Sequence, residues 1–271
     1  MKANVKNTII ILITLLLFGS ISSTRIVATS TSQPEITQEV IAEVEIPVQN
    51  KQIIFYVQHQ DDEVLFVGSA IVDAINSFGV DNVHVVLVTD GSGSGVFKFD
   101  RYINLAKEEK SQLRTNEFNS SLESLGVDMK NVIYLNQPED NVVLDSLRET
   151  ILNFEESYNE VTHISHSYKY DMHPQHLATG NLVYELYQNK QIKEVKFFTL
   201  KKYMDGLDES LVTEIKATNE EDRLKVINAC RQYEMDNGDM VREGIGYKSV
   251  ASMFDILTSG SEVISYLHSP E

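Results

Sequence analysis

After about residue 50, short apolar runs alternate with longer segments of helical spacing. Residues 51–57 and 82–89 are rich in β-branched and aromatic side chains and predict buried strands, and residues 64–75 between them predict a packed helix. A strand, a helix and a strand in this order favour parallel pairing, because the crossover helix returns the chain to the same end of the sheet.

The same alternation continues along the chain. It predicts further strands at 131–135, 161–165 and 194–200, and further helices at 107–125, 142–158, 177–187 and 224–233. We therefore expect an α/β fold, Rossmann-like and three-layered, with a mostly parallel central sheet. Nothing in the pattern indicates an internal repeat or a second folded domain.

A dense polar cluster follows the first predicted strand directly. The run His59-Gln-Asp-Asp-Glu63 places one imidazole and three carboxylic acids within five residues. Three buried carboxylates would repel one another without a counter-charge, so a bound divalent cation would account for the cluster. The cluster also lies at the carboxyl end of a strand, where open α/β sheets bind their ligands.

A second polar cluster, Tyr170-Asp-Met-His-Pro-Gln-His176, follows the predicted strand at 161–165 and precedes a predicted helix. Its two histidines, His173 and His176, are three residues apart and would share one helix face. Both clusters therefore follow strands, and their side chains can meet at the same edge of the sheet.

One ion can be bound from both clusters. His59, Asp62 and His176 would supply three ligands and leave a fourth position for water, which is typical of catalytic rather than structural zinc sites. The remaining histidines have no such pattern around them. We interpret His84 and His163 as packing or surface residues, His166 as a residue near the site without a motif, and His268 as part of a polar tail.

Together the two clusters resemble the motifs of the PIG-L/LmbE family of zinc-dependent de-N-acetylases. Members of that family carry a His-Pro-Asp-Asp-Glu loop and a later His-Pro-Asp-His loop. The resemblance implies that His59, Asp62 and His176 bind the metal, that Asp61 is the general base and that His173 is the electrophilic or acid partner. It extends more weakly from about residue 52 to residue 254.

Two residues depart from the family pattern. Gln60 stands in place of a proline, which would mainly restrict the loop backbone. Gln175 stands in place of an aspartate, and a neutral amide can keep a neighbouring histidine oriented while giving less charge stabilisation. This second change keeps open an alternative function, a catalytically weak, metal-containing protein that binds glycans.

Three further residues are candidates for contacts with substrate. Asp90 and Gly91 follow the second predicted strand, and Asp90 either contacts substrate or caps the turn. Arg114 aligns with an arginine that many family members hold near the site, where it can bond sugar hydroxyls or an acidic neighbour. The other interpretation of Arg114 is an exposed helical residue paired with Glu117. The glycine spacing at 90–95 does not match Gly-x-Gly-x-x-Gly, which argues against a nucleotide-binding Rossmann protein.

The N-terminal segment predicts export. Residues 1–28 combine a basic start with an uncharged apolar run, as a signal peptide or N-terminal anchor does. The apolar run, at about fifteen residues, is shorter than the roughly 20 that span a bilayer, which favours a cleaved signal. Residues 29–50 predict a flexible spacer, and residues 51–271 the PIG-L/LmbE-like domain. We expect a secreted or cell-surface protein.

Charge narrows the class of partner. The formal net charge is −17, so nucleic acid and anionic lipid headgroups are poor ligands, and membrane contact is expected only through the N-terminal segment. The single cysteine, Cys230, cannot form an intrachain disulfide. The expected partner is an N-acetylated sugar or glycan, of N-acetylglucosaminyl type and extracellular or wall-associated, and the expected cofactor is one Zn²⁺ ion.

Overall fold

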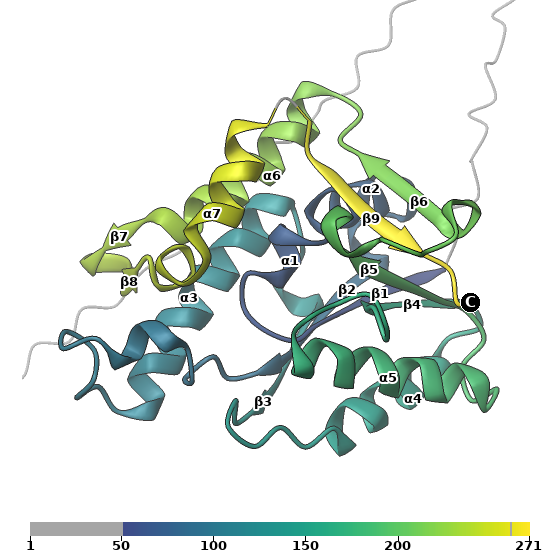
Figure 1. Cartoon of the computed structure of the whole chain (residues 1–271), viewed down its shortest axis with the longest axis horizontal. Helices are drawn as coiled ribbons and strands as arrows, with labels where there is room; N and C mark the ends of the chain where they lie inside the picture. Colours follow the sequence, from purple (N-terminus) through teal and green to yellow (C-terminus); the bar gives the residue numbers. More distant parts are fainter. Residues whose placement is uncertain (1–50, 261) are drawn as a thin grey trace, which may run out of the picture. The chain divides into compact units, whose positions relative to one another are not determined.

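The computed structural model describes residues 51–260 and 262–271 (Figure 1). The predicted signal at 1–28 and spacer at 29–50 lie outside the described residues. Among the helices that the structure describes, none combines the length and the apolar character needed to cross a bilayer.

The centre of the fold is a seven-stranded sheet with the order β3-β2-β1-β4-β5-β9-β6. Its strands are β1 (Gln52–Val57), β2 (Val83–Thr89), β3 (Val132–Gln137), β4 (Val161–His166), β5 (Val195–Thr199), β6 (Val212–Lys216) and β9 (Ile264–His268). All pairs from β3 to β5 are parallel, and β9 runs antiparallel to both of its neighbours. The predicted α/β fold with a mostly parallel sheet is confirmed.

Helices cover both faces of this sheet (Figure 1). They are α1 (Asp62–Leu65), α2 (Gly68–Phe78), α3 (Lys107–Leu125), α4 (Asp145–Ser157), α5 (Pro174–Gln188), α6 (Glu220–Glu234) and α7 (Ile245–Ser259). One apolar core joins α1, α2, α3, α6 and α7 to the sheet, and a second joins α4 and α5 to the opposite face. Successive side chains of β1 alternate between these cores, with Phe55 in the first and Tyr56 in the second.

Several short elements complete the described chain. They are the 3-10 turns η1 (Val80–Asn82), η2 (Gly95–Lys98), η3 (Met129–Asn131), η4 (Lys201–Tyr203), η5 (Glu209–Leu211) and η6 (Gly238–Met240), and the two-residue strands β7 (Asp236–Asn237) and β8 (Arg242–Glu243).

The strand order reverses between β1 and β4. From β1 the chain builds outward through β2 and β3, and it then returns to the other side of β1 to add β4 and β5. Loops leaving neighbouring strands in opposite directions open a crevice at the carboxyl ends of those strands. Both polar clusters of the sequence follow these two strands, so the topology brings them to the same crevice.

The helix predicted at 64–75 is broken in the structure. It forms α1 and α2, with Phe66 and Val67 between them, and Val67 has a non-helical backbone (φ −126°, ψ 13°). Residues 64–72 are all buried. Their positions are therefore set by packing on several sides, which overrides a local preference for one continuous helix.

The interpretation of His268 as part of a polar tail is wrong. His268 is fully buried at the end of β9, which inserts between β5 and β6. Its Nε2 lies 2.9 Å from Ser167 Oγ. A five-residue strand whose partners lie more than 45 residues earlier in the chain leaves only a weak local pattern, which explains why the sequence did not predict it.

Candidate active site

Three side-chain atoms from the two polar clusters converge in the crevice between β1 and β4. His59 Nδ1 lies 3.1 Å from His176 Nε2, and Asp62 Oδ2 lies 3.5 Å from the first atom and 3.4 Å from the second. A tetrahedral ion with bonds of about 2.0–2.1 Å separates its ligand atoms by roughly 3.3 Å. The three predicted ligands therefore have the spacing that a zinc ion requires.

Two outer side chains orient the imidazoles in this cluster. Gln175 Oε1 lies 2.7 Å from His59 Nε2, and Asp171 Oδ2 lies 3.1 Å from His176 Nδ1. Each contact places the ring proton on the outer nitrogen and leaves the inner nitrogen free to bind a metal. Gln175, expected to act on a neighbouring histidine, contacts His59 rather than His173. The backbone N–H groups of residues 172 and 173 fix Asp171 in turn by donating to Asp171 Oδ1.

The electrostatics of the cluster also suit a cation. Burial opposes the charged form of His176, but Asp62 and Asp171 outweigh it and raise the pKa of His176 to about 10. Burial likewise raises the pKa of Asp62, but the imidazoles of His176 and His166 outweigh it and hold that pKa well below its usual range. The site thus favours an ionised carboxylate together with positive charge, which a divalent ion can supply in place of the His176 proton.

His166 belongs to the site although no motif marked it. It is fully buried, its ring stacks on His176 with centroids 3.9 Å apart, and its Nε2 lies 3.2 Å from Asp62 Oδ2. The backbone N–H of Gln58 donates to the same Nε2 at 3.1 Å, which occupies its lone pair. His166 is therefore a neighbour that shapes the ligand cluster. Its position near the carboxyl end of the predicted strand at 161–165 is what placed it near the site in the sequence analysis.

Asp61 has a backbone conformation that only a few residue types tolerate. Its φ of 101° lies in the left-handed region. Its backbone N–H donates to Glu63 Oε2 at 2.9 Å, and the other oxygen of Glu63 accepts hydrogen bonds from Ser121 and Tyr233. Burial raises the pKa of Glu63 to about 8. This buried network stabilises the strained turn and directs the Asp61 carboxylate into the cavity.

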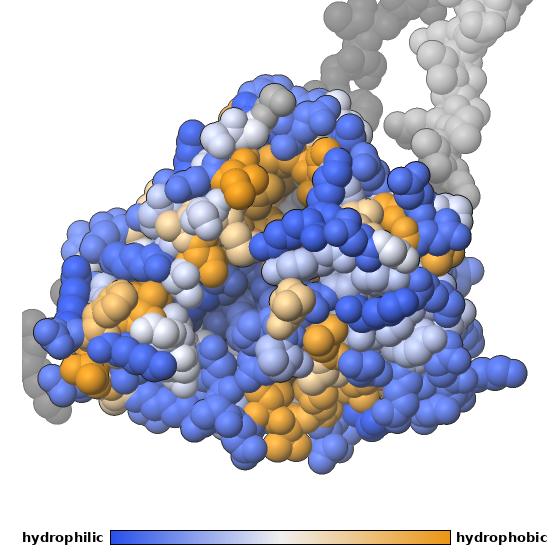
Figure 2. Space-filling model, in the orientation of Figure 1, coloured by the Kyte–Doolittle hydropathy of each residue, from blue (hydrophilic) through white to orange (hydrophobic). Residues whose placement is uncertain are grey.

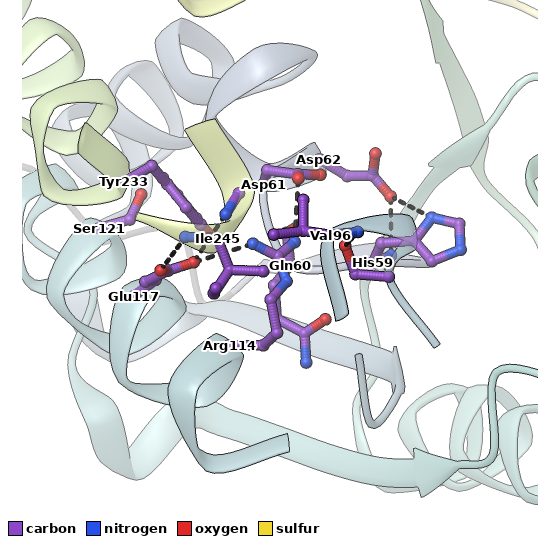
Figure 3. A network of polar contacts seen from close by, with 12 residues as sticks. His59, Gln60, Asp61, Asp62, Val96, Arg114, Glu117, Ser121, Tyr233 and Ile245 are labelled. Carbon is purple, nitrogen blue, oxygen red and sulfur yellow. Dashed lines mark hydrogen bonds and ion pairs between the residues drawn. The ribbon is translucent and has the colours of Figure 1, made fainter. Parts of the chain in front are cut away.

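Arg114 lies between two acids (Figure 3). Its guanidinium donates to Asp61 Oδ2 at 2.9 Å and to Glu117 Oε2 at 2.9 Å, and it also contacts the carbonyl oxygen of Gln60. Arg114 is only 3% exposed, so the interpretation of an exposed helical residue is wrong, although the pairing with Glu117 is present. Burial raises the pKa of Asp61 to about 6 even though Arg114 opposes the shift.

Glu117 connects this pair to a distant part of the chain. Its two carboxylate oxygens accept the backbone N–H groups of Ile245 at 2.6 Å and Gly246 at 2.9 Å, at the start of α7. A carboxylate at a helix N-terminus satisfies otherwise unpaired donors and complements the helix dipole. Asp61 is thus held by a chain of charged contacts that also fixes where α7 begins.

His173 lies at the outer side of the ligand cluster. It precedes α5 as the N-cap residue and is exposed, and its ring centroid lies 4.8 Å from that of His59 and 4.6 Å from that of His176. Burial, followed by the charges of His176 and His59, lowers the pKa of His173 to about 4. His173 is therefore a neutral imidazole next to the cluster.

The two predicted loop residues have different surroundings. Gly91 lines the same cavity as His59 and has φ +71°, and a side chain there would collide with Gln60. Asp90 instead lines a neighbouring hollow, where it accepts from Ser92 N at 3.0 Å and pairs with Lys107 Nζ at 2.8 Å. Of the two roles considered for Asp90, the structure therefore places it in the cap of the turn.

A close approach of backbones sets the position of α5. A Cβ added to Gly180 would come within 2.7 Å of the backbone of Ser167 and closer still to the carbonyl oxygen of His166. Only a residue without a side chain allows α5 to lie this near the end of β4. Because His176 is on the same helix, this contact also sets how far His176 reaches into the crevice.

The converging groups line one cavity of about 450 Å³, within the range of about 300–1,000 Å³ typical of small-molecule sites. The space-filling view is hollowed between the α7 and α5 sides, with hydrophobic residues around the hollow (Figure 2). His59, Asp61, Asp62, Arg114, His173 and His176 all line this cavity. The remaining strand histidines do not. His84 contacts Gln52, and His163 contacts Tyr56 and Glu155 on the opposite face.

Comparison with known families identifies this arrangement. Residues 54–187 match the family model described as PIG-L: GlcNAc-PI de-N-acetylase. The chain contains a PIG-L domain. The match includes both polar loops, so the resemblance seen in the two motifs is confirmed. Among curated proteins, none matches this sequence.

Solved structures share the fold of the PIG-L domain at low identity. The A40926 pseudoaglycone deacetylase Dbv21 is 17% identical with a TM-score of 0.57, over 82% of this chain and all of that one. The N,N′-diacetylchitobiose deacetylase from Pyrococcus horikoshii is 18% identical with a TM-score of 0.52, over 79% and 80% of the two chains. The 4-carboxy-2-hydroxymuconate hydratase GalB from Pseudomonas putida is 15% identical with a TM-score of 0.53, over 82% and 97%. One fold therefore carries both deacetylases and a hydratase, and the site must decide the chemistry.

Proposed function

We propose that this protein is a zinc-dependent hydrolase that removes the acetyl group from an N-acetylated amino sugar. The observation that carries the proposal is the convergence of His59, Asp62 and His176 beside the carboxylate of Asp61 in one cavity. The PIG-L family match and the two deacetylases that share the fold support the same reaction class.

The donor set fits one zinc ion, held by His59 Nδ1, Asp62 Oδ2 and His176 Nε2. When bound, zinc supplies Lewis-acid chemistry, which polarises a carbonyl oxygen and acidifies a water molecule. Asp61 is the adjacent carboxylate that accepts the proton of the attacking water, because Arg114 orients its Oδ2. The strained backbone of Asp61 keeps this carboxylate beside the donor set rather than within it.

His173 completes the chemistry at the open side of the cluster. As a neutral imidazole it can donate a hydrogen bond to the oxygen on which charge develops, while the proton that Asp61 takes from the attacking water passes to the leaving amine. Attack of water on the amide carbon breaks the C–N bond and gives acetate and a free amino sugar. Gln175 does not contact His173, so the change from the family's aspartate acts on His59 instead.

The substrate that we propose is an extracellular or wall-associated glycan of N-acetylglucosaminyl type. Two features of the sequence support this choice, the export-like N-terminal segment and the net charge of −17, which repels phosphate-rich partners. The cavity agrees in one respect. Among the described residues that line it, Arg114 is the single Lys or Arg, and its guanidinium is already bound to Asp61 and Glu117.

Release of acetate from chitooligosaccharides by the zinc-loaded protein tests the proposal. Zinc content is measured on the same sample, and removal of the metal by a chelator should stop release, with recovery when zinc is added back. Full zinc content without acetate release from a broad panel of N-acetylated glycans would favour the alternative, a metal-containing glycan-binding protein. Release that persists after complete metal removal would contradict zinc dependence.

A further inference from the structure

One wall of the cavity is apolar. Leu200 and Tyr203 follow β5, and Val250 and Met253 come from α7, and all four are half-buried and line the cavity. Leu200, Val250 and Met253 pack with their inner sides against the main hydrophobic core. They are therefore held in place and present a fixed apolar surface to whatever enters.

The backbone of α7 is distorted where it forms this wall. Val250 has φ −142° and ψ 43°, which are non-helical values, and no proline lies in the helix to cause the kink. The chain thus keeps an irregular helix at the point where it turns a valine toward the cavity. The start of the same helix is fixed by Glu117, so the wall and the general base share one support.

The inner end of the cavity is different. Leu65 and Phe66 are both 6% exposed, and the Phe66 ring packs edge-on against His176, with centroids 5.6 Å apart. These tightly buried residues line the cavity beside the ligand cluster, where the proposed function puts the acetyl group. The half-buried wall belongs to the outer part of the cavity, where the rest of the substrate must lie.

We infer that the outer wall formed by Leu200, Tyr203, Val250 and Met253 binds an apolar group attached to the amino sugar on the side away from its acetamide. The inference rests on the proposed function, because the acetamide fixes which end of the substrate faces the ligand cluster. The substrate class thus narrows from N-acetylglucosaminyl glycans in general to those whose N-acetylated sugar carries an alkyl or similarly apolar aglycone. A free cation for an anionic aglycone is not among the described residues lining the cavity, whereas apolar contact area is.

Turnover of three matched substrates by the full-length zinc-loaded protein tests this inference. They are methyl N-acetylglucosaminide, octyl N-acetylglucosaminide below its micelle concentration, and methyl N-octanoylglucosaminide. Each buried methylene contributes roughly fourfold to affinity, so we expect KM for the octyl glycoside to be at least about tenfold below that for the methyl glycoside. Equal KM values for the two glycosides would overturn the inference, as would preference for the N-octanoyl substrate.

A pair of variants in α7 assigns the effect to the wall. Met253→Gln should raise the ratio of KM for the octyl glycoside to KM for the methyl glycoside about fivefold. The control is Ile256→Gln on the same helix, where Ile256 is 72% exposed and does not line the cavity. Identical behaviour of the two variants would overturn the inference.

A binding measurement separates this inference from the proposed function. If no substrate releases acetate, calorimetric titration with octyl and methyl N-acetylglucosaminide still compares the effect of the apolar group alone. At least tenfold tighter binding of the octyl compound would support the binding of an apolar aglycone by this wall, even though the hydrolase proposal fails. Equal binding of the two compounds would overturn the inference that the wall binds an apolar aglycone.

Discussion

Two clusters of histidine and carboxylate lie on this sheet, and they differ in how their nitrogen and oxygen atoms are arranged. On the face covered by α4 and α5, Tyr56 Oη lies 2.8 Å from His163 Nδ1, and His163 Nε2 lies 3.1 Å from Glu155 Oε2. Each polar atom of that cluster has its own partner, arranged in a line. The cluster is complete as it stands and satisfies buried groups.

The cluster at the carboxyl ends of β1 and β4 has the opposite arrangement. A single atom, Asp62 Oδ2, has imidazole nitrogens of His59, His166 and His176 within 3.5 Å, and the outer nitrogens of His59 and His176 have separate partners. A carboxylate oxygen and unprotonated imidazole nitrogens all present lone pairs, and lone pairs that face one point repel one another unless a cation lies among them. Convergence of donor atoms, rather than burial or residue type, therefore distinguishes a metal site from a structural hydrogen-bond network.

The strongest test of this comparison removes one histidine from each cluster. His176→Ala should abolish zinc binding and lower turnover at least about a thousandfold, since the metal supplies several kcal/mol of charge stabilisation. His163→Ala should leave the zinc content and kcat near wild type. Zinc content by elemental analysis and acetate release measure both. Loss of zinc from the His163 variant alone would reverse the assignment of the two clusters.

A second variant separates metal binding from proton transfer within the cluster at the carboxyl ends of β1 and β4. Asp61→Asn should retain zinc and lose about 10²–10⁴ in kcat, because an amide cannot accept the proton of the attacking water. Asp145→Asn, an exposed acid in the first turn of α4, is the control and should change neither. Full activity of the Asp61 variant would remove Asp61 from the role of base.

Removing a side chain that orients one of the imidazoles should have a smaller effect on zinc binding. Gln175→Ala should weaken zinc affinity about 10–100-fold, because His59 loses the contact that fixes its ring. Gln191→Ala, an exposed glutamine beyond the end of α5, provides the matched control. Competition with a fluorescent zinc chelator measures the affinity. Unchanged affinity in the Gln175 variant would mean that packing alone orients His59.

A mutation in the cluster of Tyr56, His163 and Glu155 should change the stability of the protein rather than its activity. Tyr56→Phe removes one buried hydrogen bond and should lower the free energy of unfolding by about 0.5–1.5 kcal/mol, with zinc content unchanged. Urea denaturation followed by circular dichroism measures this change. Loss of zinc without loss of stability would contradict the separation between the two clusters.

The pH dependence of stability gives the smallest signal. Burial lowers the pKa of His163, although Glu155 opposes the shift, so the unfolded state binds a proton first as pH falls. Stability should therefore decrease as pH falls below about 6.5, by at most about 1.4 kcal/mol per pH unit for this group. In His163→Gln this part of the slope should be absent. An unchanged slope in denaturation curves between pH 5 and 7 would argue against a neutral buried His163.

Local patterns predicted much of this fold. The five parallel strands and the helix Lys107–Leu125 follow from apolar runs and spacing, since each is long enough to carry its own signal. The C-terminal strand β9 and the break between α1 and α2 did not follow. Both depend on contacts with segments far away in the sequence, and local propensity contains no information about those contacts.

The candidate site was predictable to a similar degree. The two loops identified His59, Asp62 and His176 because their residue types are unusual in combination. The contact of Gln175 with His59 required the neighbouring positions of β1 and β4, which only the three-dimensional arrangement supplies. The contact of Asp171 with His176 is local, and it required the conformation of the turn that precedes α5. The motifs thus predicted which side chains converge, whereas the contacts that orient those side chains depend on the fold.

Gly180 shows what a survey of motifs alone would overlook. A methyl group at this position would push α5 away from the strand and withdraw His176 from its neighbours, although each motif residue would remain unchanged. We expect related sequences with both loops intact but a larger residue here to match the motifs and yet to hold the histidine of the second loop in a different position. Annotation of such sequences should therefore ask for the missing side chain as well as for the histidines.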